Sequence, residues 1–227
     1  MQRYTLGFPA AALALGLGSF SAAAQAPISP QPSSITPQFA QFLQSKFNRD
    51  AVRAAATNQI SKWPGSCSEI SFDSKFDVVV LQPAQFSADA RSLTAGAWIE
   101  SFTVTACGVT RRHNIFNVVK GSPVLRLPKL VGTSRADHQL QTDAAPHLFA
   151  GAARFVPQGC KSFYASDTQF LGEEGAVISN AKPGPACAWR EEWTLWACGK
   201  EIVVPIKFIP DATGTGIIAD GSKVRVK

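Results

Sequence analysis

Hydrophobic residues at helical spacing mark the beginning of the predicted fold. Thr36-Pro37 is typical of an N-cap followed by a first helical position. Apolar side chains then recur on one side until about Ala56, so we predict an amphipathic helix over this stretch. Its apolar positions are Phe39, Phe42, Leu43, Phe47 and Ala51. A second helix is predicted from Leu140 to Phe155, with a break and restart at Pro146.

Alternating residues in the segment 98–107 predict a strand with two distinct faces. One face carries Trp98, Glu100, Phe102, Val104 and Ala106. Gly108-Val109 suits a two-residue turn, and residues 111–119 then form the returning strand of a hairpin. The β-branched run at 76–81 is the best candidate for an interior strand.

The hairpin sequence occurs twice. Residues 98–108 return as residues 189–199, and six of the eleven positions are identical. The second hairpin turns at Gly199-Lys200 and returns over 202–209, where Pro205 predicts an edge strand or a bulge because proline cannot donate to a ladder. The match continues upstream at Cys67 and Cys160, and downstream at Gly132-Thr133 and Gly214-Thr215. We therefore predict a tandem duplication.

The predicted fold class is α+β. The first repeat spans residues 36–131 and the second spans 132–227, and each is a helix with a small antiparallel sheet built around the central hairpin. We expect three strands in each sheet. Because such a sheet is marginally stable alone, the two copies should pack together or share one larger sheet.

The first residues carry the features of a secretory signal peptide. Arg3 precedes an apolar stretch that ends in Ala22-Ala23-Ala24, so we place the signal peptide at 1–24. Cleavage after Ala26 also fits the small-residue pattern, but Pro27 disfavours it. A Pro/Ser-rich tether follows at 25–35, and no later stretch is apolar enough for a transmembrane segment. The expected location is the periplasm or the extracellular space.

The five cysteines fit an oxidising compartment. Equivalent residues of the two copies should form equivalent disulfides, which predicts Cys67–Cys107 and Cys160–Cys198 and leaves Cys187 free. The alternative pairs Cys160 with Cys187 and leaves Cys198 free.

The formal net charge is +6, with the basic residues scattered along the chain. This distribution does not predict specific nucleic-acid binding, and the partner that the charge predicts is an anionic envelope component, held by weak attraction. The three histidines show no metal-ligand spacing with cysteine or acidic residues, and we predict neither a metal site nor a cofactor.

Two glutamates flanked by aromatic residues are the candidate binding or catalytic groups. Glu100 lies between Trp98 and Phe102, and the second set is Trp189, Glu191 and Trp193. Such a carboxylate suits a general acid or a sugar-stacking surface. The structural interpretation is that the rings pack on a helix while each glutamate pairs with a lysine or arginine of the next strand. We favour that interpretation because catalytic machinery is rarely needed twice.

The sequence therefore favours a non-enzymatic binding or structural protein of the envelope, whose partner is an anionic component or another envelope protein. The alternative is a hydrolase of an envelope polymer that uses Glu100 or Glu191 as a general acid/base.

Overall fold

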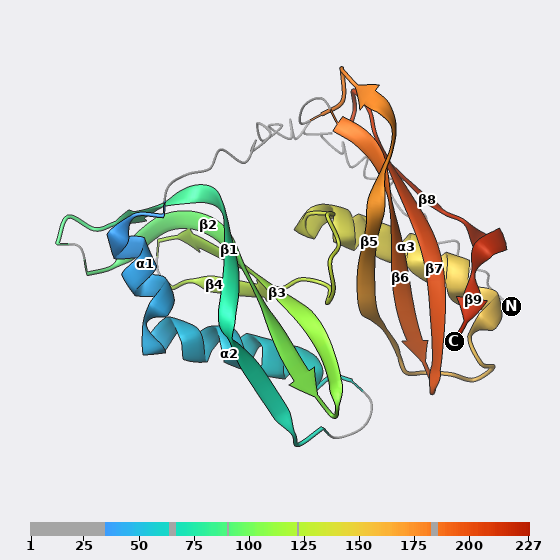
Figure 1. The fold of residues 1–227 in the computed structure, drawn as a ribbon, viewed down its shortest axis with the longest axis horizontal. Helices are drawn as coiled ribbons and strands as arrows, with labels where there is room; N and C mark the ends of the chain where they lie inside the picture. Colours follow the sequence, from blue (N-terminus) through green and yellow to red (C-terminus); the bar gives the residue numbers. More distant parts are fainter. Residues whose placement is uncertain (1–34, 64–66, 90, 122, 183–185) are drawn as a thin grey trace, which may run out of the picture.

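The computed structural model describes residues 35–63, 67–89, 91–121, 123–182 and 186–227. The predicted signal peptide at 1–24 and residues 25–34 of the predicted tether lie outside these ranges. Within them, the chain forms three α-helices and two separate antiparallel sheets, so the α+β class is confirmed. Figure 1 shows two lobes, which we name lobe A (α1 to β4) and lobe B (α3 to β9).

Two helices replace the single helix predicted at the start of lobe A. Helix α1 spans Pro37–Gln44 and α2 spans Lys46–Ile60. Thr36 is the N-cap of α1, as predicted, and its hydroxyl accepts a hydrogen bond from the N–H of Phe39. Ser45 divides the helices because its backbone is extended and its groups cap both ends: its N–H donates to Phe42, and its side chain accepts from Asn48.

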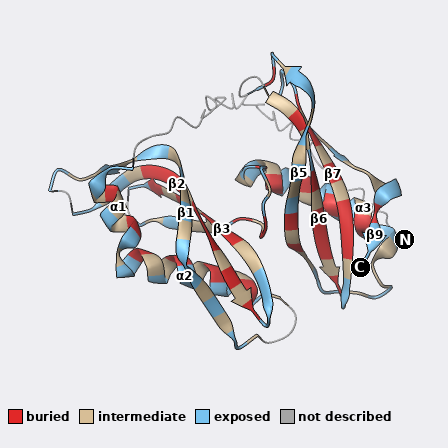
Figure 2. Cartoon of the chain, in the orientation of Figure 1, coloured by how far each residue is buried: buried red, intermediate tan, exposed pale blue. Residues whose placement is uncertain are grey.

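Sheet A has the strand order β1-β2-β3-β4 and therefore one strand more than predicted. Its strands are β1 (Ile70–Phe86), β2 (Leu93–Ala106), β3 (Val109–Lys120) and β4 (Leu125–Pro128). The interior strands are β2 and β3, as the buried residues in Figure 2 show. The prediction of an interior strand at 76–81 is wrong, because this run lies in the edge strand β1 and none of its residues is fully buried.

The core of lobe A forms between sheet A and the helices. Val52, Ala56 and Ile60 of α2 pack against the face of β2 that carries Phe102 and Val104. Helix α1 packs against the other end of the same face, where Phe39 contacts Trp98 edge-on. The alternation predicted for β2 is therefore observed. The prediction that Phe47 lies on the apolar side of the helix is wrong, because Phe47 is 71% exposed.

Both hairpins turn one residue earlier than predicted. Ala106 pairs with Val109, which makes Cys107-Gly108 the two-residue turn, and Ala197 pairs with Lys200 around Cys198-Gly199. All four turn residues have positive φ angles, which is the requirement of a type I′ turn. The sequence predicts a turn that begins at glycine, whereas a cysteine with a left-handed backbone occupies the first turn position in each hairpin.

Lobe B, like lobe A, places its α-helical part before its strands. It contains α3 (His138–Ala152), a 3-10 turn η1 (Ala153–Phe155), and four strands in the order β5-β6-β7-β8: β5 (Phe163–Ile178), β6 (Ala186–Ala197), β7 (Lys200–Pro210) and β8 (Thr215–Ala219). After the short η2 (Gly221–Lys223), strand β9 (Arg225–Val226) also pairs with β7. Sheet B thus has five strands within the described residues, not three.

Helix α3 covers one face of sheet B and runs through Pro146 without the predicted break. Ala144, Leu148 and Ala152 face the core, whereas Pro146 is on the exposed side. The Thr142 carbonyl, which loses its helical N–H donor to proline, therefore faces solvent and can bond water instead.

Pro205 lies inside β7, so the predicted edge position or bulge is wrong. Strand β9 pairs with residues 202–203 of β7 and β8 pairs with residues 206–210, which leaves Pro205 at the interruption. Its carbonyl faces this side and accepts from the Asp220 N–H. The nitrogen of a strand residue faces the same side as its carbonyl. The nitrogen of Pro205 therefore faces the interruption between β8 and β9, where neither strand requires an N–H donor from β7.

The linker at 129–137 joins the lobes and bonds to both sheets. Gly132 donates to the carbonyl of Arg112 in β3 and forms a parallel bridge with Thr168 in β5. The N–H of the next residue, Thr133, donates to the Thr168 carbonyl at 2.7 Å. The sheets themselves stay separate, so the predicted alternative of one larger sheet is wrong.

Candidate functional site

Glu100 lies in the core of lobe A with 1% exposure. Its carboxylate accepts from the indole N–H of Trp98 at 3.0 Å and from the side-chain amide of Asn48 at 3.1 and 3.2 Å. Burial raises the pKa of Glu100, while these hydrogen bonds and the charges of Arg126 and Arg49 act in the opposite direction. The group has the raised pKa of a general acid but no opening toward a substrate.

Glu191 lies in the core of lobe B and is fully buried. Its Oε1 accepts from the indole N–H of Trp189 at 2.9 Å and from the backbone N–H of Arg135 at 2.8 Å. Its Oε2 accepts from the indole N–H of Trp193 at 2.7 Å. The carboxylate therefore joins strand β6 to the linker, which is a structural use of its hydrogen-bonding capacity.

The predicted aromatic-flanked sets are thus assembled, but in two separate cores. Trp98 packs edge-on against Phe39 and Phe42 of α1, as the structural interpretation expected, whereas Trp189 stacks on Phe208 of β7. The expected ion pairs are not formed, because indole, amide and backbone N–H groups occupy the carboxylates. Neither glutamate directs its carboxylate into an open cleft.

Both predicted disulfides are present. Cys67 joins Cys107 and Cys160 joins Cys198, with Cα atoms 5.6 and 5.8 Å apart. Each disulfide ties the segment before the first strand of its lobe to the turn of its hairpin. Among the described residues Cys187 is the free cysteine, and it lies beside Glu173, which Arg135 also contacts.

Removing either disulfide is expected to lower the free energy of unfolding by about 4 kcal/mol, because each closes a loop of about 40 residues in the unfolded chain. The measurement is denaturant unfolding of the Cys67→Ala/Cys107→Ala and Cys160→Ala/Cys198→Ala double variants. Cys187→Ala is the control and should change this free energy by less than about 1 kcal/mol. A Cys160–Cys187 peptide in non-reducing mapping would contradict the pairing.

His113 is buried beneath the end of lobe A that faces lobe B. Its Nδ1 lies 3.1 Å from Oε1 of Gln59, whose amide nitrogen donates to the carbonyl of Lys129 in the linker. The Gln59 oxygen is thus an acceptor, which places a proton on Nδ1. Burial lowers the pKa of His113 to about 4, and the charge of Arg111 acts in the same direction.

This shift makes stability depend on pH. The pKa of His113 is lower in the folded chain than in the unfolded chain, so its contribution is complete above pH 6.5 and is lost as the pH falls toward 4. We expect the loss to reach about 3 kcal/mol. Comparing the wild type with His113→Gln by unfolding from pH 7 to 4 isolates this effect, because the opposing contribution of Glu100 is common to both. Parallel profiles would contradict the expectation.

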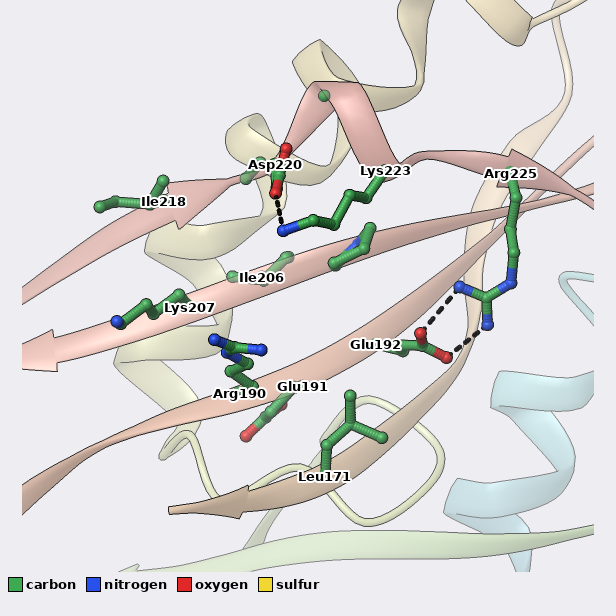
Figure 3. Close-up of a pocket in the computed structure, with 13 residues that line it drawn as sticks. Leu171, Arg190, Glu191, Glu192, Ile206, Lys207, Ile218, Asp220, Lys223 and Arg225 are labelled. Atoms are coloured by element: carbon green, nitrogen blue, oxygen red, sulfur yellow. Dashed lines mark hydrogen bonds and ion pairs between the residues drawn. The ribbon is translucent and has the colours of Figure 1, made fainter. Parts of the chain in front are cut away.

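A groove of about 430 Å³ lies on the face of sheet B opposite α3. Figure 3 shows Leu171 of β5 and Ile218 of β8 on its two sides, and these residues are 50% and 52% exposed. Pro205 contributes to its floor. Glu191 borders the groove, but strand alternation directs its side chain to the opposite face.

The charged residues around this groove are already paired. Arg225 binds Glu192 through two hydrogen bonds of 2.8 and 2.6 Å, and Lys223 contacts Asp220 at 2.8 Å. Arg190 and Lys207 share Glu174. The groove is therefore an apolar patch whose rim carries four basic side chains and three acidic partners, and each of these basic side chains is already engaged in an ion pair.

At the corresponding place of sheet A, a side chain holds the linker on the sheet. Asn114 occupies the position in β3 that Pro205 occupies in β7, since their partners Ser101 and Glu192 are three residues after Trp98 and Trp189. The Asn114 amide donates to the carbonyls of Leu130 and Gly132 at 3.2 and 2.9 Å and holds the linker on the sheet. Pro205 has no side-chain N–H, so it cannot hold a chain segment on sheet B in the way that Asn114 holds the linker on sheet A.

No protein-family model, curated protein or solved structure matches this chain. Its function is therefore argued from its own residues. In the described part, no cluster of three or more metal-binding side chains occurs, and none of the helices combines the length and apolar character needed to span a membrane.

A second hollow, of about 240 Å³, lies between the two lobes. Trp63, which follows α2 in lobe A, stacks on Tyr164 of β5, and Tyr164 stacks on Trp196 of β6. Arg111 of β3 places its guanidinium 5.3 Å from the Trp63 ring and 3.5 Å from Glu201 of β7. We name this set of five residues the aromatic cleft.

The residues that the two hairpins share give no sign of the aromatic cleft, so their pattern did not predict it. Trp196 stands two residues before its turn cysteine, where the first hairpin has Thr105. The residue paired with Trp196 is Tyr164, and the residue paired with Thr105 is Ser71. The sequence signal for the aromatic cleft is therefore a difference between equivalent positions, where the first half has a small polar residue and the second half has an aromatic residue.

Proposed function

We propose that this protein is an exported, non-enzymatic binding protein of the periplasm or extracellular space, and that the aromatic cleft is its binding site. The observation that carries the proposal is the different placement of the residues that the two hairpins share and the residues that differ between them. Most residues shared by the two hairpins lie in cores and turns, although Ala106 and Cys107 among them also border the hollow. The cleft residues Arg111, Trp196 and Glu201 instead occupy positions at which the two hairpins differ. Hollows between domains are also the preferred places for ligand sites.

A tandem duplication at 36–131 and 132–227 accounts for this distribution. The two halves place a helix, a disulfide cysteine, three long strands and a short strand in the same order. Both hairpins turn at a Cys-Gly pair of positive φ. One copy of such a unit has no second lobe to face it, so a cleft between lobes is a feature that only the duplicated chain provides.

The hydrolase alternative receives less support. A general acid or base must approach the bond that it protonates or deprotonates within hydrogen-bond reach. Glu100 and Glu191 are instead buried in separate lobes and bonded to indole, amide and backbone donors. Export is supported by the two disulfides, which persist in oxidising compartments.

Affinity capture from cell-envelope extract tests the proposal. The oxidised wild type is immobilised beside Trp196→Ala and the control Phe47→Ala, which removes an exposed ring outside the cleft. We expect the wild type and the control to retain the same component and Trp196→Ala to lose it. Equal retention by all three would contradict a role for the cleft. Turnover of peptidoglycan or other glycans by the wild type would contradict a non-enzymatic function.

A further inference from the structure

The three rings of the aromatic cleft form a staircase. The planes of Trp63 and Tyr164 differ by 12° and their centroids are 5.7 Å apart, while those of Tyr164 and Trp196 differ by 28° at 5.5 Å. Nearly parallel rings at these separations are displaced sideways, as in offset stacking. Part of each ring face is therefore left uncovered by its neighbour, and all three residues line the hollow and are only half-buried.

Polar groups stand at the edge of the staircase. Arg111 and Glu201 form an ion pair across the lobes at 3.5 Å, and both line the same hollow. Their charges balance, so the cleft does not select a charged ligand by net charge. The guanidinium offers several donors and the carboxylate several acceptors, while the Tyr164 hydroxyl supplies both. Burial raises the pKa of Tyr164, which keeps this hydroxyl protonated at neutral pH.

A ligand that fits this arrangement is flat and apolar on one face and carries neutral donors and acceptors around its edge. A pyranose ring has this form, because its C–H groups gather on a face while its hydroxyls project from the perimeter. The hollow of about 240 Å³ has room for a ligand of the size of one sugar unit. We propose that the aromatic cleft binds a pyranose unit of an oligosaccharide, an inference that rests on the proposed function.

Both lobes contribute residues to the aromatic cleft. Trp63 and Arg111 belong to lobe A, whereas Tyr164, Trp196 and Glu201 belong to lobe B. A sugar ring seated in the hollow would contact both lobes and oppose their separation. Binding should therefore protect the linker at 129–137 from opening, in addition to quenching the fluorescence of the cleft tryptophans.

The test uses two defined probes, a β-1,4-linked N-acetylglucosamine tetrasaccharide and a β-1,4-linked glucose tetrasaccharide. Isothermal titration calorimetry compares the oxidised wild type with Trp196→Ala, Trp196→Phe and the control Phe47→Ala. We expect saturable binding of at least one probe by the wild type, a loss of at least ten-fold in affinity for Trp196→Ala, and substantial rescue by Trp196→Phe. Unchanged affinity in Trp196→Ala, or no binding of either probe by the wild type, would overturn the proposal.

Saturation-transfer NMR on the wild type keeps the test independent of how the variants fold. Irradiation of aromatic protons should saturate the C–H protons on one face of the sugar in preference to the other protons, and uniform transfer would count against stacking. The two proposals also fail differently. If envelope capture depends on Trp196 but neither tetrasaccharide binds, the carbohydrate inference is wrong while the binding function stands. If capture is also independent of Trp196, both are wrong.

Discussion

Replacing Glu191 with leucine is expected to lower the free energy of unfolding by about 5 kcal/mol, the upper range for a single substitution. The variant leaves three N–H donors without their acceptor in a buried site: the indoles of Trp189 and Trp193 and the backbone N–H of Arg135. Each unsatisfied buried donor costs about 1–3 kcal/mol. Denaturant unfolding of the oxidised protein provides the measurement.

Glu192→Gln is the matched control for this variant, since it changes the next carboxylate on the same strand. Glu192 lies on the opposite face of β6, and within the described ranges its side chain binds Arg225 at the surface of the lobe. Its loss should lower the free energy of unfolding by less than about 1 kcal/mol. Similar effects of the two substitutions would show that the buried hydrogen bonds of Glu191 contribute little.

Gly132→Ala is expected to break the contact between the linker and β5, at a cost on the order of 5 kcal/mol if the junction is to remain closed. Gly132 has a φ angle of +108°, and a Cβ atom there would overlap the carbonyl oxygen of Thr168 and lie 2.6 Å from its backbone nitrogen. Neither backbone atom can move aside without disrupting β5. The variant should therefore open between the lobes, which limited proteolysis within 129–137 and small-angle scattering both report.

Gly216→Ala is the corresponding control in lobe B. Gly216 has no left-handed φ angle, and a Cβ atom there would meet only the carbonyl oxygen of Ile209 at an ordinary 3.6 Å. This variant should resemble the wild type in proteolysis and scattering. If Gly132→Ala also resembles the wild type, the junction at Thr168 does not hold the lobes together.

The sequence predicts those parts of the fold that depend on local pattern. The face of β2 that carries Trp98 and Val104 follows from alternation, and the N-cap at Thr36 follows from its residue type. The disulfides follow from the equivalence of the two hairpins. These features require no knowledge of what a segment packs against.

The errors occur where a neighbouring segment decides the outcome. Pro205 tolerates an interior strand because β8 and β9 leave a gap beside it. The run at 76–81 belongs to the edge strand of sheet A as far as the structure describes the chain, and its position in the sheet depends on segments that its own pattern does not reveal. The partners of Glu191 include a backbone N–H of the linker, 56 residues earlier in the chain, which has no sequence signature. The aromatic cleft likewise depends on how the lobes meet, and Trp63 and Tyr164 give no sign of that contact in the sequence.

The backbone angles of the turn cysteines make the stability of both hairpins depend on oxidation. Cys107 and Cys198 hold left-handed backbone angles that cost a non-glycine residue about 1–2 kcal/mol, and oxidation fixes each of them in place. Before oxidation, both hairpins carry this cost without the compensating bond. The folded form of the reduced chain is thereby less stable than that of the oxidised chain. Oxidation therefore stabilises the left-handed turn of each hairpin in addition to closing its loop.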